Sequence, residues 1–209
     1  PTPCENFGWG EVEDYTVFIN PPGIPVETGI VSQATSSWQT VNLQRNYTNM
    51  VVVATVNYRT AEDTAVVRIR NASGTSFEMM IQNPMELEIL GGYDVHYVVV
   101  EEGIYNVAEH GIKMEAILDT STKTARKGKW TKEKRIYQNI YASPVVVGQV
   151  MTYNDPDWSN FWASSINKGK PPDHRFYAGK HVGEDRDKTR ADETIGYIVV
   201  EAGEGIINN

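Results

Sequence analysis

The chain has 209 residues, a formal net charge of −8 and no run of eighteen apolar residues. This length allows one large core or two small ones. The negative charge and the lack of a basic run argue against a nucleic-acid partner, because that affinity comes mainly from neutralising phosphates, and the lack of a long apolar run argues against membrane insertion.

Residues 1–22 form an opening segment in which residues 15–19, β-branched and aromatic, predict a short strand before a proline–proline–glycine breaker. The stretch 10–15, Gly-Glu-Val-Glu-Asp-Tyr, resembles the closing motif of the GEVED domain of secreted and cell-surface bacterial proteins. The resemblance implies that residues 1–22 are the tail of an upstream domain of the same polypeptide. Because the chain starts at Pro1, we expect a piece of a longer protein that is secreted or on the cell surface. Cys4 is then either a free thiol or the partner of a cysteine further upstream.

The rest of the sequence repeats itself. Residues 97–103, Tyr-Val-Val-Val-Glu-Glu-Gly, recur at 197–203 as Tyr-Ile-Val-Val-Glu-Ala-Gly, and Trp38 and a valine run at 51–53 recur as Trp130 and a valine run at 145–147. The offset grows along the chain while the order of the apolar runs is kept. This pattern indicates a duplicated unit with variable connections, and it predicts repeat 1 at residues 23–110 and repeat 2 at residues 111–209.

Both repeats are predicted to be all-β. Residues 64–70 and 76–82 alternate between apolar and polar, as in half-buried strands, whereas residues 51–54 are apolar on both faces, as in a central strand. The link at 104–116 contains no proline, which favours repeats that pack on each other. We therefore expect two tandem antiparallel β-sandwiches of about six strands each, packed together. The expected strands lie near residues 29–32, 39–43, 50–58, 64–70, 76–82 and 95–100, and near 129–135, 144–153, 159–165, 175–181 and 194–200.

Each repeat resembles the H-type lectin domain, a six-stranded β-sandwich that binds sugars, often as an oligomer. The resemblance lies in the order of a tryptophan-bearing strand, a valine strand, a Gly-x-x-Phe strand start at 74–77 and a closing aromatic-valine strand. It implies that Arg59 and Arg68 of repeat 1 lie where that family binds its sugar. Repeat 2 has no arginine between Arg135 and Arg175, so its site is expected to be built differently.

The loop at 153–158 is the most site-like feature of repeat 2, because sugars stack their C–H faces on aromatic rings while their hydroxyls bond to amides and carboxylates. Two interpretations of its tryptophans stay open, one that they fill the core and one that they are exposed at a site. The loop at 170–173, which has no counterpart of equal length in repeat 1, could bring His174 and Arg175 close to the Trp158 loop. The predicted ligand-binding residues of repeat 2 are Tyr153, Asn154, Asp155, Asp157, Trp158, Trp162, His174 and Arg175.

An acidic cluster near the end of repeat 2 has the carboxylates that calcium prefers. Its members Glu184, Asp185, Asp187 and Asp192 lack the spacing of an EF-hand and are interleaved with basic residues, so a salt-bridged surface loop explains them equally well. Calcium is thus the one cofactor that the sequence suggests. No paired histidines point to zinc, and no Gly-x-Ser-x-Gly elbow points to a nucleophile.

These features favour a non-catalytic, lectin-like module that binds a polysaccharide or glycan as part of a larger secreted or surface protein. The first alternative is a structural or adhesive spacer without a sugar site. The second is a polysaccharide lyase that uses His174, Arg175 and a tyrosine. Assembly into an oligomer stays open at this stage.

Overall fold

The computed structural model describes residues 23–58, 64–84, 91–165 and 175–203. These residues form thirteen strands and one short helix, α1 (Val107–His110), which ends at Gly111 in the left-handed conformation (φ 73°). The predicted all-β class is confirmed. In the described ranges no helix has the length and apolar character needed to cross a membrane.

Repeat 1 is a sandwich of two antiparallel sheets. Its inner sheet has the order β1 (Val26–Thr35), β5 (Gly91–Glu101), β3 (Met50–Asn57), and its outer sheet pairs β2 (Gln39–Tyr47) with β4 (Val66–Gln82). Alternate side chains of both sheets meet in one core, as the sequence pattern predicts. Fully buried members of this core include Val52, Ile69, Phe77, Met79 and Val95.

The element β4 is longer than any predicted strand because it contains two strands and their turn. Arg68 contacts Gln82, and Arg70 pairs with Glu78 at 2.5 Å. A straight strand would hold residues 14 positions apart roughly 45 Å from each other, so the chain must double back between these pairs. Asn71 and Gly74, with φ of 51° and 64°, supply the left-handed backbone for this turn.

Repeat 2 repeats this plan with an added strand in its inner sheet. The inner sheet has the order β10 (Pro144–Val150), β13 (Glu193–Glu201), β7 (Met114–Ser121), β6 (Gly103–Tyr105). In the outer sheet, β12 (Arg175–His181) pairs with β11 (Asn160–Ser164), with β9 (Lys134–Ile136) and, in parallel, with β8 (Thr124–Ala125). The strands β6, β7 and β8 are not among the predicted ones.

The register of the inner sheets shows that the two repeats share one framework. Val26 lies opposite Val100 in repeat 1, and Met114 lies opposite Val200 in repeat 2. In the same way Met50 faces Glu101, and Pro144 faces Glu201. These pairs reproduce the offsets of the sequence repeat, so strand order and register were kept while the connections changed.

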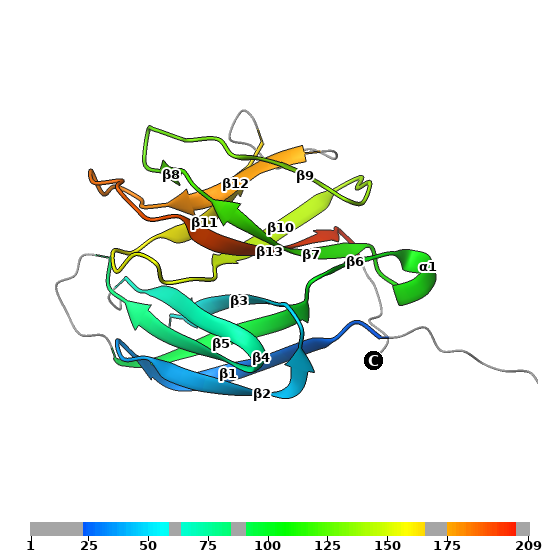
Figure 1. Ribbon diagram of the computed structural model, residues 1–209, viewed down its shortest axis with the longest axis horizontal. Helices are drawn as coiled ribbons and strands as arrows, with labels where there is room; N and C mark the ends of the chain where they lie inside the picture. Colours follow the sequence, from blue (N-terminus) through cyan, green and yellow to red (C-terminus); the bar gives the residue numbers. More distant parts are fainter. Residues whose placement is uncertain (1–22, 59–63, 85–90, 166–174, 204–209) are drawn as a thin grey trace, which may run out of the picture.

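The two sandwiches pack through their inner sheets, as expected, and Figure 1 shows repeat 1 (blue to green) against repeat 2 (green to red). A separate apolar cluster fills this interface with side chains from both repeats. Burial of such apolar surface stabilises the pair by roughly 25 cal/mol per Å². The most buried members are Ile24, Val51, Val100, Met114, Ala116 and Ile198.

Candidate ligand-binding cleft

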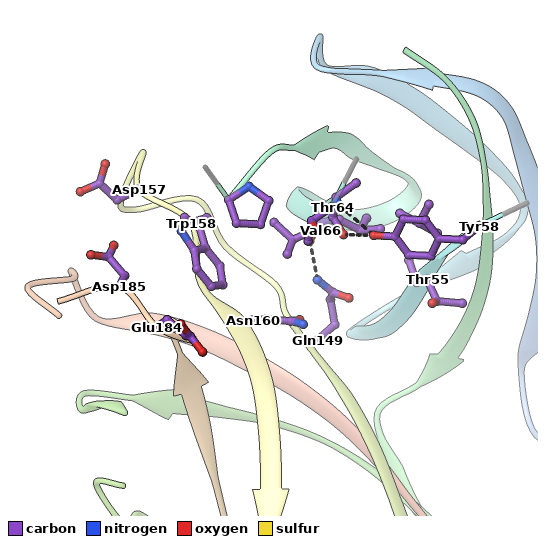
Figure 2. A pocket seen from close by; sticks show the side chains of 15 residues that line it. Thr55, Tyr58, Thr64, Val66, Gln149, Asp157, Trp158, Asn160, Glu184 and Asp185 are labelled. Carbon is purple, nitrogen blue, oxygen red and sulfur yellow. Dashed lines mark hydrogen bonds between the residues drawn. The ribbon is translucent and has the colours of Figure 1, made fainter. Parts of the chain in front are cut away.

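A cleft of about 1120 Å³ lies where the two repeats meet, and Figure 2 shows its lining. Repeat 1 contributes the end of β3 and the start of β4, and repeat 2 contributes β10, the start of β11 and two adjoining loops. The described lining contains three carboxylates and no lysine, arginine or histidine. Its residues are Ala54, Thr55, Val56, Tyr58, Thr64, Ala65, Val66, Val67, Pro84, Gln149, Asp157, Trp158, Asn160, Glu184 and Asp185.

One wall of the cleft is a free strand edge. The N–H group of Val52 donates to Met151 Sδ at 3.4 Å, so it points away from β5. Because backbone groups alternate in direction along a strand, Ala54 and Val56 direct their N–H and C=O groups the same way, toward the cleft. Within the described residues these groups have no ladder partner, since β3 is the last strand of its sheet.

On another wall of the cleft, the side chains of Tyr58 and Gln149 form hydrogen bonds with backbone groups of Ala65 and Val67, at the start of β4. The hydroxyl of Tyr58 donates to the carbonyl of Ala65 at 2.7 Å and accepts from the Ala65 N–H at 2.8 Å. Gln149, only 3% exposed, donates from Nε2 to the carbonyl of Val67 at 2.8 Å. This bond fixes the amide and leaves Oε1 without a hydrogen bond from any described residue.

Trp158 is the tryptophan of the cleft, and the residues around it fix its position. Its carbonyl accepts from Arg190 Nε at 3.1 Å, and the Asp157 N–H before it donates to Asp155 Oδ1 at 3.0 Å. Gly183 lies against its ring, since a Cβ added there would be 3.0 Å from Trp158 Cη2. The ring is half-buried, so one part packs on Gly183 while another part faces the cleft.

Three carboxylates gather on one side of the Trp158 ring in Figure 2, with Gln149 and Tyr58 on the other. Arg190, whose side chain is 1% exposed, pairs with Asp185 at 2.9 Å and with Asp157 at 3.6 Å. The exposed Lys127 pairs with Glu184, and its hydrogen bond and charge lower the pKa of that carboxyl below its usual value. Three negative charges therefore face two positive ones.

The buried carboxylate of Glu193 holds the loop that carries Trp158 by accepting hydrogen bonds from it. Glu193, 1% exposed, accepts from Thr152 Oγ1 at 2.5 Å and from the N–H groups of Asn154 and Asp155 at 3.1 Å. Asp155 in turn accepts from the Ala191 N–H at 2.7 Å. Asn154 and Asp155, predicted as ligand-binding residues, therefore shape the loop.

Arg68 holds the same loop from repeat 1. Its NH2 group donates to the carbonyl of Asp155 at 2.9 Å and its NH1 group to that of Asp157 at 3.2 Å, while the guanidinium lies 4.6 Å from the centre of the Tyr153 ring. Burial lowers the pKa of Arg68. Arg68 was predicted as a sugar-binding residue; its side chain is only 1% exposed, and its guanidinium donates to this loop. Arg68 and Tyr153 join the two repeats.

The other predicted residues that the structure describes do not line the cleft. Trp162 packs edge-on against Trp130 at 5.0 Å, and Trp130 lies 4.6 Å from the ring of His181. Arg175 begins β12, whereas the cleft lies beyond the His181 end of that strand, roughly 20 Å away. Arg59 and His174 lie outside the described residues.

The four acidic residues suggested for calcium are not assembled as a metal site. Asp185 pairs with Arg190 and Glu184 with Lys127, while Asp187 accepts from the Thr189 N–H at 2.8 Å, a bond that lowers the pKa of Asp187. In the part of the chain that the structure describes, no group of three or more His, Cys, Asp or Glu side chains could hold a metal ion. The ion pairs of Glu184 and Asp185 agree with the interpretation as a salt-bridged surface loop.

The sequence analysis missed several cleft residues, namely Thr55, Tyr58, Gln149 and Asn160. Gln149 carried one available signal, since it is a polar residue that follows a valine run inside a predicted strand. Such a residue is buried only with a partner. The partner, the carbonyl of Val67, lies in the other repeat and could not be inferred from the local sequence.

Comparison with known proteins gives one similarity. No family model and no solved structure matches the chain. The chain is similar to halomucin of Haloquadratum walsbyi, with 27% identity over 203 residues that cover 90% of this chain. The chain spans about 2% of the length of halomucin.

Proposed function

We propose that this chain is a non-catalytic, lectin-like carbohydrate-binding module of a larger secreted or cell-surface protein, and that it binds a polysaccharide segment in the cleft between its repeats. The observation that carries the proposal is Trp158, half-buried and framed by Asp157, Glu184 and Asp185. A sugar ring stacks its C–H face on an indole while carboxylates accept hydrogen bonds from its hydroxyls.

The shape of the cleft supports a ligand larger than one sugar. Its volume of about 1120 Å³ is slightly above that of ordinary small-molecule pockets, which span roughly 300–1,000 Å³. Gln149 Oε1 and the backbone of Ala54 and Val56 continue the polar lining away from Trp158. An oligosaccharide would therefore find a stacking platform at one end and hydrogen-bonding groups along its length.

The expected role as part of a longer protein is supported by the similarity to halomucin, of which this chain matches about 2% of the length. A unit that is similar to a small portion of a much longer chain fits a modular function. Secretion or surface display is part of the same proposal, together with the sequence resemblance of residues 10–15 to a domain of surface proteins.

A glycan array followed by affinity electrophoresis tests this function. The wild-type protein should bind at least one polysaccharide, and Trp158→Ala should abolish the mobility shift because it removes the stacking platform. Trp158→Phe should keep part of the binding. Tyr177→Ala is the matched control, since Tyr177 is a half-buried aromatic residue on β12 that does not line the cleft.

The spacer hypothesis remains the second candidate, and the packing of the repeats favours it. The inner sheets share the buried apolar cluster around Val51, Met114 and Ile198, and Arg68 ties the loop of one repeat to the other. Such packing gives a rigid unit of defined length. If no polysaccharide binds the wild-type protein, this hypothesis replaces the lectin-like one.

A further inference from the structure

We infer that the cleft selects sugars that carry a free ammonium group, that is, unacetylated amino sugars, over acidic sugars. This inference rests on the proposed function and adds the chemical class of the ligand. It comes from the balance of hydrogen-bond acceptors, donors and charges around Trp158.

The first observation is charge. Among the described residues, the carboxylates of Asp157, Glu184 and Asp185 form ion pairs with Arg190 and Lys127, so the carboxylates that line the cleft outnumber the cations paired with them. Neither Arg190 nor Lys127 is among the described residues that line the cleft. The carboxylates of the cleft would repel a uronic acid or a sulfated sugar, whereas they would attract an ammonium group.

The second observation is the buried hydrogen-bond acceptor Gln149 Oε1, which lies apart from the three carboxylates. Gln149 is 3% exposed, and its Nε2 group is committed to Val67, so its orientation is fixed with Oε1 as the group left for a ligand. The edge of β3 adds the C=O groups of Ala54 and Val56. An ammonium group donates three hydrogen bonds and accepts none, so it suits Gln149 Oε1 and these carbonyl groups, while the N–H groups of the same edge are left for sugar hydroxyls.

The third observation is the place of Trp158 beside the carboxylates. Figure 2 shows its indole between the acidic residues and the amide of Gln149. An indole face attracts cations as well as the C–H face of a sugar. An amino sugar stacked there would have its ring on Trp158 and its ammonium within reach of acceptors on either side.

The experiment compares three tetrasaccharides by isothermal titration calorimetry: β-1,4-linked glucosamine, its fully N-acetylated counterpart and an α-1,4-linked galacturonate. We expect the glucosamine tetramer to bind at least tenfold more tightly than the acetylated one, and the galacturonate not to bind. Raising the salt from about 50 to 500 mM should weaken the glucosamine complex several-fold, because salt screens the charge.

Two variants identify the source of the preference. Asp157→Asn combined with Glu184→Gln should reduce the preference for glucosamine at least fivefold, and the double variant keeps side-chain shape at partly or largely exposed positions. Glu109→Gln on α1 is the control, because its side chain is 67% exposed and does not line the cleft. Tetralysine tests whether positive charge alone is sufficient.

Equal or tighter binding of the acetylated or acidic tetramer would overturn the inference and leave the proposed function in place. Equal binding of tetralysine would show a site for any cation and overturn the inference as well. No binding of any of these sugars, together with an empty glycan array, would overturn the proposed function and this inference with it.

Discussion

The guanidinium of Arg68 in repeat 1 donates to the backbone carbonyl of Asp155 in repeat 2 at 2.9 Å. A buried arginine thus binds the loop that presents Trp158, and the position of the cleft residues depends on how the repeats pack.

Arg68→Ala should destabilise the protein by about 3 kcal/mol, because it leaves buried carbonyls without their charged donor. Urea unfolding followed by tryptophan fluorescence measures the loss. Arg70→Ala is the control, since Arg70 is 36% exposed in its pair with Glu78 and should contribute about 1 kcal/mol or less. Equal losses of stability in the two variants would contradict the role of Arg68 in holding the loop of repeat 2.

Gly183→Ala should weaken glycan binding at least tenfold. The new methyl group would lie 3.0 Å from Trp158 Cη2 and would displace the ring, and the backbone at φ 56° would be strained by roughly 1 kcal/mol. Calorimetric titration of a bound oligosaccharide measures the change.

Gly128→Ala is the matched control for that prediction. Gly128 has a similar φ of 73°, but among the described residues no atom lies within 4 Å of an added Cβ. It should show the same backbone strain and unchanged binding. Binding that falls equally in both variants would mean that strain, and not the Trp158 contact, is responsible.

Glu193→Ala should loosen the loop at 153–157, because it leaves the Thr152 hydroxyl and the N–H groups of Asn154 and Asp155 without their shared acceptor. We expect a loss of about 2–3 kcal/mol in the free energy of unfolding and faster amide exchange of these two residues. Amide protons that exchange at the wild-type rate would contradict this role.

Stability should also depend on pH through Glu115. Its side chain is fully buried and accepts from the N–H groups of Gln138 and Asn139, and burial raises its pKa above the ordinary value of 4.5. Above pH 4.5 the unfolded chain has lost this proton while the folded chain still holds it, so this group's contribution to stability falls as pH rises to the raised pKa.

Glu115→Gln removes that contribution. Relative to wild type, the variant should gain stability as the pH rises from about 4 to 8, with Glu109→Gln as an exposed control. Thermal unfolding at a series of pH values measures the difference. A wild-type-minus-variant difference that stays constant, or that changes in the other direction, would contradict the raised pKa.

The strands were predictable where side chains alternate or repeat. The valine strands β3 and β10 and the closing strands β5 and β13 stand out because their apolar residues recur in order. The strand β7 was not predicted, because its apolar residues are mixed with Glu115 and Asp119. Glu115 is buried there because backbone N–H groups from another segment satisfy it, which no local pattern reveals.

The cleft was predictable only in part. Asp157 and Trp158 lie in a short loop with an evident mixture of aromatic and acidic residues, so the sequence pointed to them. The same loop contains Tyr153 and Asp155, which hold the loop in place. The residue type alone does not reveal whether a side chain lines the cleft or holds the loop. Thr55 and Gln149 join the cleft only through the packing of the repeats.

The most direct test of the central claim is a spectrum of the five tryptophan indole N–H groups, recorded by nuclear magnetic resonance with ¹⁵N labelling. The glucosamine tetrasaccharide and then its acetylated form are added, and Trp158→Phe assigns its signal. The account predicts that a bound sugar shifts the Trp158 signal most and leaves those of Trp38 and Trp130 in place. Binding that shifts another indole and leaves Trp158 unchanged would contradict it.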